Sequence, residues 1–233
     1  SGTVAELPAS GEVVVSVDAA DVGADAADSD DALTRVTVPA KYVARLPPFS
    51  LEGISLRCLH DLVDAHATLL GPAATTRDLA ERVIAPLTAA SGLSLAAALR
   101  RARARDETFT GASVPCAGRP TLAVAHAAAA SLSSLLAALD AHAAAAGLAH
   151  ESLVLWIDVC STPLSHDAAP PPGWWSSAAL AHGVKAVGSA LLVLSPSAPL
   201  AMRDGRALFT AVAAIRAGIP LELRMPPAEI PEL

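Results

Sequence analysis

Three short apolar runs, each followed by a helix-length segment rich in alanine, constrain the fold of this chain more than any other feature. The runs cover residues 121–125, 153–157 and 190–194. A chain that repeats strand, crossover helix and strand at this spacing is typical of a parallel β-sheet covered by helices on both faces. The pattern therefore predicts an α/β fold in three layers. The expected helices and last strand cover residues 130–146, 176–187, 204–217 and 219–223.

The N-terminal part of the chain begins with two candidate strands. Residues 12–17 and 34–43 are apolar enough for strands, and an acidic, alanine-rich segment that ends at Asp31 separates them. We expect these strands to pair as a hairpin with a long loop. Pro39 lies inside the second strand and favours an edge position, because proline cannot donate a hydrogen bond to a neighbouring strand.

From about residue 55 the apolar residues change to a helical period. A first helix is expected there, and residues 75–78 provide an N-cap signal for a second. We expect Pro86 to kink or end that second helix, since proline disrupts the helical hydrogen-bond ladder. A third helix is expected over residues 94–105.

The segment 106–120 is rich in glycine, proline, threonine and serine, which is typical of a linker. We therefore expect an N-terminal unit of strands and helices over residues 1–110. The α/β domain is expected over residues 118–233.

Composition argues against several kinds of partner. The net charge is −7, and no cluster of Lys and Arg is longer than residues 100–105, so neither nucleic acid nor an anionic membrane is expected as the main partner. Apolar residues make up 53% of the chain, but many are alanine, and glycine, proline or histidine interrupts the long uncharged stretches. Membrane insertion is therefore not expected.

The chain has three cysteines, an odd number without metal-type spacing. Neither a disulfide framework nor a zinc site is expected, and a reducing intracellular compartment is the default. No two of the histidines expected on helices or at helix ends have the i, i+4 metal spacing with a carboxylate nearby. The cysteines are Cys58, Cys116 and Cys160. Those histidines, which we expect in contact with solvent, are His142, His150 and His182.

Polar side chains follow each of the three predicted strands. Ligands of parallel sheets bind at the carboxyl ends of the strands, and there the chain places His126, Asp158 and Ser195. Asp158 could bind a ribose hydroxyl, hold a metal or act as a base, or it could only cap the turn. His126 could take part in a site or hydrogen-bond a neighbouring loop.

Two further features carry a functional and a structural interpretation. Cys160 could be a nucleophile beside His126 or His166, which would need a lowered pKa, or it could be a packing residue. The adjacent Trp174 and Trp175 could form a binding surface, or they could staple the start of the next helix. Glycine-rich phosphate motifs and the G-x-S-x-G nucleophile motif are absent from the sequence.

Four segments, taken in order, resemble the TIR-like domains of green algae and other protists. They are the run 75–88, Ala125-His126, Trp156-Ile157-Asp158, and the run 192–196. The resemblance covers most of residues 53–227 and implies a flavodoxin-like TIR fold.

The departures from that family pattern bear on activity. The family's Ser-His-Ala-Trp stands here as Ala125-His126-Ala127-Ala128, and Thr210 stands where NAD-cleaving members have a glutamate. The resemblance implies that this glutamate engages the nicotinamide ribose. Asp204, at the start of the helix, and Glu222, on the next strand, do not replace it. Stabilising a developing cation needs a fixed negative charge at the site, so no NAD hydrolysis is expected.

These observations predict a non-catalytic, TIR-like interaction or scaffold module without a cofactor, whose partners are other proteins of a larger assembly. The alternative is an NAD-cleaving hydrolase, or a nucleotide-binding sensor, that uses the crevice near His126 and Asp158. In the first case a vestigial pocket would be formed by His126, Asp158, Cys160, Ser195 and Thr210. The expected location is cytoplasmic, and a ciliary complex is an association suggested by the algal resemblance.

Overall fold

The computed structural model describes residues 51–103, 115–164, 178–195 and 199–230, together with the backbone of three strands before residue 40. The chain divides into two compact units, Ser1–Leu46 and Pro47–Leu233. The acidic segment that ends at Asp31 and the pair Trp174-Trp175 lie outside the described residues, so their interpretations stay predictions.

The first unit contains one antiparallel sheet with the strand order β1-β2-β3. Strand β2 (Glu12–Val17) pairs with β3 (Thr34–Pro39), which confirms the predicted pairing. Pro39 is the last residue of β3, and β3 is an edge strand, as the missing N–H of proline requires. Strand β1 (Gly2–Glu6) pairs with the other side of β2 and was not predicted.

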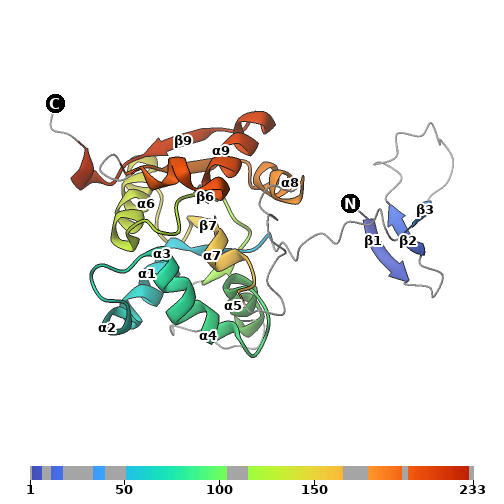
Figure 1. Ribbon diagram of the computed structural model, residues 1–233, viewed down its shortest axis with the longest axis horizontal. Helices are drawn as coiled ribbons and strands as arrows, with labels where there is room; N and C mark the ends of the chain where they lie inside the picture. The colour runs from blue at the N-terminus through green and yellow to red at the C-terminus, as the bar shows by residue number, and fades with distance from the viewer. Residues whose placement is uncertain are drawn as a thin grey trace. The chain divides into compact units, whose positions relative to one another are not determined.

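The second unit is built on a six-stranded sheet with the order β5-β4-β7-β6-β8-β9 (Figure 1). The last four strands in this order run parallel, while β4 pairs antiparallel with both of its neighbours. The predicted α/β fold with a parallel core is therefore confirmed, and a short antiparallel edge is added to it. The strands are β4 (Gly53–Ser55), β5 (Ala117–Gly118), β6 (Leu122–Ala125), β7 (Val154–Ile157), β8 (Ala190–Val193) and β9 (Leu221–Arg224).

Helices cover both faces of this sheet. The α-helices are α1 (Leu56–Ala65), α2 (Ala67–Leu70), α3 (Thr76–Leu79), α4 (Ala85–Thr88), α5 (Leu95–Arg103), α6 (Leu132–Ala146), α7 (Asp158–Ser161), α8 (Ala178–Val187) and α9 (Gly205–Ala217). A π-helical segment, Ala80–Ile84, joins α3 to α4, and 3-10 turns cover Leu200–Arg203 and Pro227–Glu229.

Alternate residues of the parallel strands pack into different cores. Leu122 and Val124 of β6 contribute to a core shared with α1, α5 and α6, whereas Ala123 packs with α8 and α9. This alternation is the pattern of a strand buried on both faces. On the α8 and α9 side many contacts are made by alanine, so helices approach the sheet closely, and Trp156 fills part of the remaining space.

The strand order creates a switch point between β6 and β8. The chain enters the parallel sheet at β6, moves to one side to form β7, and then crosses back to form β8 on the other side. Connections that leave two neighbouring strands in opposite directions open a crevice at their carboxyl ends. The most favourable place for a ligand in this fold therefore lies above β6 and β8.

The second predicted helix is longer and less regular than expected. Thr75 and Asp78 form the predicted capping box, in which each side chain accepts a hydrogen bond from the backbone N–H of the other residue. The chain then stays helical past Pro86. Pro86 has no N–H to donate to the carbonyl four residues earlier. Directly before it, the Ala85 N–H donates to the Ala80 carbonyl, and this hydrogen bond over five residues is of the π-helical type.

Segments on both sides of the expected boundary near residues 110–118 share one sheet and one core. Strand β4 pairs with β7, and the buried side chains of α1 and α5 belong to the same core as those of α6. Gly53 allows this close pairing, since a Cβ at this position would lie 2.5 Å from the Leu155 carbonyl oxygen. The division between compact units falls instead between Leu46 and Pro47.

Among the helices of the described residues, none combines the length and the apolar character that crossing a membrane requires.

Candidate functional site

The carboxyl ends of the parallel strands bring several of the predicted site residues together. His126 follows β6, Asp158 follows β7, and Thr210 reaches the same place from α9; all three line one small crevice. Ser195, after β8, lines a neighbouring cavity that it shares with His126. Cys160 lines neither of these two spaces.

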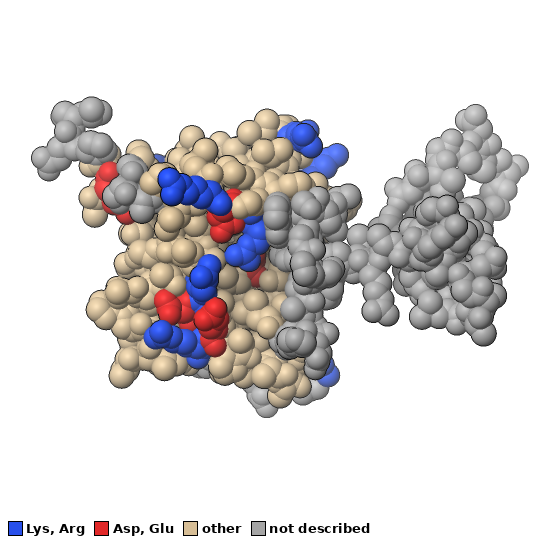
Figure 2. Space-filling view, in the orientation of Figure 1, with Lys and Arg blue, Asp and Glu red and all other residues tan. Residues whose placement is uncertain are grey.

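The carboxylate of Asp158 is engaged by an arginine that the sequence analysis did not single out. Arg206 Nη1, from the first turn of α9, lies 2.9 Å from Asp158 Oδ2, and the Val159 backbone N–H donates to Asp158 Oδ1 over 2.8 Å. The crevice that this pair shares with His126 and Thr210 measures about 10 Å³, which is room for about one water molecule. Asp158 and Arg206 also line a second cavity of about 250 Å³ beside α3 and the π-helical segment. In Figure 2 the charged side chains of the visible face gather in a band over α3 and α7, while most of that face is uncharged. The crevice that Asp158 shares with His126 is therefore nearly filled, whereas the second cavity is not.

His126 is a buried imidazole in the same crevice. Its Nε2 has no hydrogen-bond partner among the described residues. Burial lowers the pKa of His126, and the Asp158 carboxylate opposes that shift. The imidazole is therefore neutral at physiological pH, and its unpartnered nitrogen is a polar group that a ligand or a water molecule could satisfy.

Cys160 lies in α7 and is fully buried in the large core. Burial raises the pKa of this thiol well above its usual range, and the negative charge of Asp158 raises it further. A protonated thiol without access to solvent is a poor nucleophile. The geometry therefore favours the packing interpretation of Cys160.

Thr210 lines the crevice, but its hydroxyl is already used within the helix. Thr210 Oγ1 donates to the Arg206 carbonyl oxygen over 2.9 Å. Asp204 caps α9 by accepting from the backbone N–H groups of Arg206 and Ala207, and Glu222 on β9 pairs with a histidine and an arginine. Asp204 and Glu222, the two acids weighed as replacements for the expected glutamate, thus have structural partners.

A larger cavity of about 250 Å³ lies at the switch point between β6 and β8. Its polar lining includes Ser131 and Ser134 at the start of α6, together with Ser195 and His126. Glu229, from the 3-10 turn after β9, accepts hydrogen bonds from Ser195 Oγ and, over 3.3 Å, from Ser134 Oγ. This carboxylate was not predicted, because Glu229 follows the last strand and no local pattern connects it to β6 or β8.

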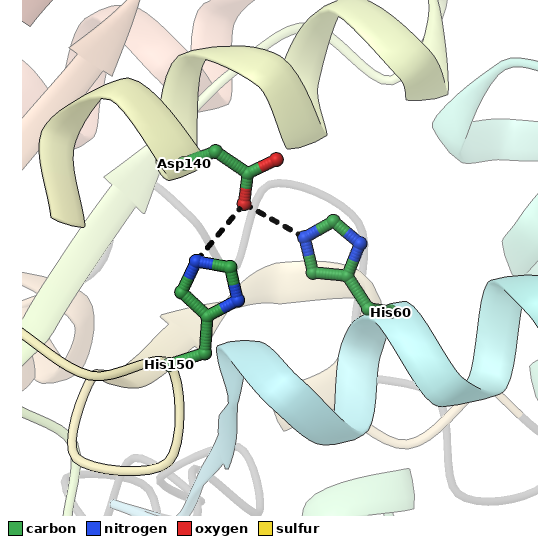
Figure 3. Close-up of side chains that lie close together, drawn as sticks. All are labelled: His60, Asp140 and His150. Carbon is green, nitrogen blue, oxygen red and sulfur yellow. Dashed lines mark hydrogen bonds and ion pairs between the residues drawn. The ribbon is translucent and has the colours of Figure 1, made fainter. Parts of the chain in front are cut away.

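A second missed group lies away from the strand ends. His60, Asp140 and His150 present three ligand atoms within 4.8 Å of one another, and they are the described residues whose geometry could hold a metal ion (Figure 3). Of the histidines expected in contact with solvent, His142 is only 12% exposed and pairs with Glu222. His150 is 39% exposed, and its Nε2 also lies 3.4 Å from Asp140 Oδ1. The 80 residues that separate His60 from Asp140 conceal this contact in the sequence.

No protein-family model, curated protein or solved structure matches this chain in the three comparisons made.

Proposed function

We propose that this chain is a non-catalytic, TIR-like interaction module that binds a protein partner through a groove between α8 and α9. The observation that supports this most is the groove itself, which has a volume of about 370 Å³. Its apolar lining includes Phe209, Val212 and Ala213. Concave apolar surfaces of this kind are typical of sites that receive a helix from another protein.

Apolar side chains remain exposed on the outer face of α9. Val212 is 41% exposed and Ile215 is 66% exposed. Alanines beside them, including Ala181 and Ala217 in the groove, let a partner helix approach closely. Burying such side chains in an interface contributes about 25 cal/mol for each Å² removed from water.

The rim of the groove specifies the charge of the partner. Lys185 on α8 and Arg216 on α9 both line it. These two cations complement an amphipathic helix with an apolar stripe flanked by glutamate or aspartate. The partner we propose is therefore an acidic amphipathic helix.

The filled crevice supports the non-catalytic part of this proposal. Arg206 neutralises Asp158, the carboxylate that would otherwise act as a base or stabilise a cation. Thr210 offers no carboxylate, and the crevice that it shares with the pair has room for about one water molecule. A ribose that entered the larger cavity beside Asp158 would meet a carboxylate already paired with Arg206.

A peptide titration tests the interaction. We expect an amphipathic helix with leucines on one face and flanking glutamates to bind the full chain at least about tenfold more tightly than the same helix with flanking lysines. Val212→Asp should abolish that binding, whereas Leu69→Asp should not, since Leu69 is an exposed apolar residue of α2 and does not line the groove. Equal affinity for the two peptides, or equal loss in the two variants, would refute the proposal.

Incubation with NAD tests the absence of catalysis. Nicotinamide release should stay at the level of a buffer control, both for the full chain and for Asp158→Ala. Release by the full chain that is lost in Asp158→Ala would support the hydrolase alternative instead.

The cavity at the switch point favours one further candidate, a sensor that binds part of a nucleotide without cleaving it. The cavity of about 250 Å³ is smaller than typical pockets for a drug-sized ligand, so it would receive a single ribose or phosphate group. Its hydroxyls and the Glu229 carboxylate suit a ribose better than a phosphate. A rise in melting temperature with ADP-ribose, lost in Ser195→Ala, would support this candidate.

A further inference from the structure

One cluster of side chains is not used by the proposed interaction and lies outside the strand-end crevice. It is formed by His60 of α1, Asp140 of α6 and His150 of the turn after α6 (Figure 3). We infer that these three residues form a binding site for a zinc ion.

The three ligand atoms converge on one point. His60 Nε2 lies 2.8 Å from Asp140 Oδ1, and His150 Nε2 lies 3.4 Å from the same oxygen. Zinc holds imidazole nitrogen and carboxylate oxygen at about 2.0–2.2 Å, so in a tetrahedral site these atoms lie roughly 3.2–3.6 Å apart. Small side-chain rotations would therefore open the shorter distance enough to admit the ion.

The two imidazole rings are already arranged side by side. Their centroids are 5.4 Å apart and their planes differ by 6°. In Figure 3 a nitrogen of each ring points toward the same oxygen of Asp140. Both rings thus present a nitrogen to one space, which lowers the conformational entropy lost when an ion is bound.

The donor set selects the class of metal. Two imidazole nitrogens and one carboxylate oxygen are typical ligands of zinc and related transition metals, whereas calcium and magnesium prefer sites made of oxygen alone. One carboxylate and two neutral imidazoles also leave a single negative charge to balance the divalent ion. We therefore expect zinc to bind and magnesium to have no effect.

The surroundings leave the fourth coordination position to water. The side chains of His60, Asp140 and His150 are 25%, 40% and 39% exposed, so solvent reaches the cluster. The carboxylates that follow His60 and His150 in the sequence are engaged by Arg57, which lies 3.1 Å from Asp61 and 4.0 Å from Glu151. The protein thus supplies three ligands, as in zinc sites that keep an open position.

Zinc titration of the full chain, without affinity-tag histidines, tests this inference. We expect one zinc ion per chain in a competition assay with a chromophoric chelator, and Co²⁺ should give the visible absorption of a site with nitrogen and oxygen ligands. His60→Gln and Asp140→Asn should each weaken zinc binding by at least about tenfold. His182→Gln, which changes an exposed histidine of α8 outside the cluster, should leave it unchanged.

Circular dichroism of each variant separates loss of binding from loss of folding. Asp140→Asn keeps the size of the side chain and a hydrogen-bond acceptor for either imidazole, so we expect it to fold. Wild-type protein that binds no zinc at about 100 µM free ion, a concentration that saturates sites of micromolar affinity, would overturn the inference. Variants of the cluster that fold and bind as tightly as wild type would overturn it as well.

Discussion

Two carboxylates of this molecule lie beside nitrogen-containing side chains of different kinds, and this difference decides which of the two carboxylates can share in binding a metal ion. Asp158, at the end of β7, pairs with the guanidinium of Arg206. Asp140, on α6, lies beside the imidazoles of His60 and His150. A guanidinium stays protonated in proteins and has no lone pair to offer, whereas an imidazole becomes a ligand when it loses a proton.

Position in the fold does not by itself make a site. Asp158 occupies the edge of the sheet where α/β proteins bind ligands and lines a cavity of about 250 Å³ as well as the small crevice, yet its carboxylate is paired with Arg206. Asp140 lies on a helix away from that edge, yet solvent reaches it. The partner of a carboxylate, more than its place in the fold, therefore decides whether the carboxylate can act on a ligand.

The largest expected difference between the two carboxylates is in the response to zinc. At about 100 times its dissociation constant, zinc should raise the free energy of unfolding of the wild-type chain by about 2.7 kcal/mol. The effect should vanish in Asp140→Asn and persist in Asp158→Asn. Urea denaturation with and without zinc measures this rise in the free energy of unfolding. A rise that persists in Asp140→Asn would show that Asp140 is not a ligand of the zinc ion.

The second effect concerns the pair at the strand ends. Arg206→Met should lower the free energy of unfolding by about 1–3 kcal/mol, because it leaves the mostly buried Asp158 carboxylate without its cation. The double variant Asp158→Asn, Arg206→Met should recover part of that loss. Urea denaturation of the three proteins provides the test; additive losses in the double variant would show that the two side chains are not coupled.

The third effect concerns the pH dependence of the free energy of unfolding, to which the buried His126 contributes. Burial is the main cause that lowers the pKa of His126 in the folded state. In the unfolded chain this pKa has its ordinary value of 6.5. The unfolded chain therefore binds more protons than the folded chain as the pH falls below 6.5. The stability that neutral His126 provides is complete above that pH and is lost below it, by up to about 1.4 kcal/mol per pH unit. His126→Leu should remove this part of the slope when unfolding is measured between about pH 7.5 and about pH 5.5. An unchanged slope would mean that His126 is protonated in the fold.

The smallest effect is expected at Thr210. Thr210→Val removes a hydrogen bond to a carbonyl of the same helix, and the free energy of unfolding should fall by no more than about 1 kcal/mol. Nicotinamide release from NAD should remain at background. Release by the wild-type chain above background that is lost in Thr210→Val would show that this threonine acts on NAD.

Much of the second unit could be predicted from local sequence. The runs that form β6, β7 and β8 are apolar over whole strands, and Ser131 and Asp204 cap the long helices α6 and α9, so local sequence predicts these elements. Strand β5 has two residues and β4 has three, which is too short for a period to be visible. Their place in the sheet depends on the pairing of β5 with β4 and of β4 with β7. For that reason the linker near residues 110–118 suggested a boundary between segments that share one core.

The candidate sites were predictable only in part. His126 and Asp158 could be placed at one edge because the ends of parallel strands meet there. Arg206 and Glu229 reach that region from later elements, and the contact of Asp140 with His60 and His150 depends on how α6 packs beside α1. Such contacts depend on tertiary packing, so no spacing of residues in the sequence predicts them.

An X-ray structure of the full chain crystallised with zinc, with anomalous data collected at the zinc edge, tests the contrast between the two carboxylates most directly. We predict an anomalous peak between His60, Asp140 and His150, and none beside Asp158, whose carboxylate should still contact Arg206. The absence of a peak at the histidine cluster, or a peak beside Asp158 with Arg206 displaced, would contradict this interpretation.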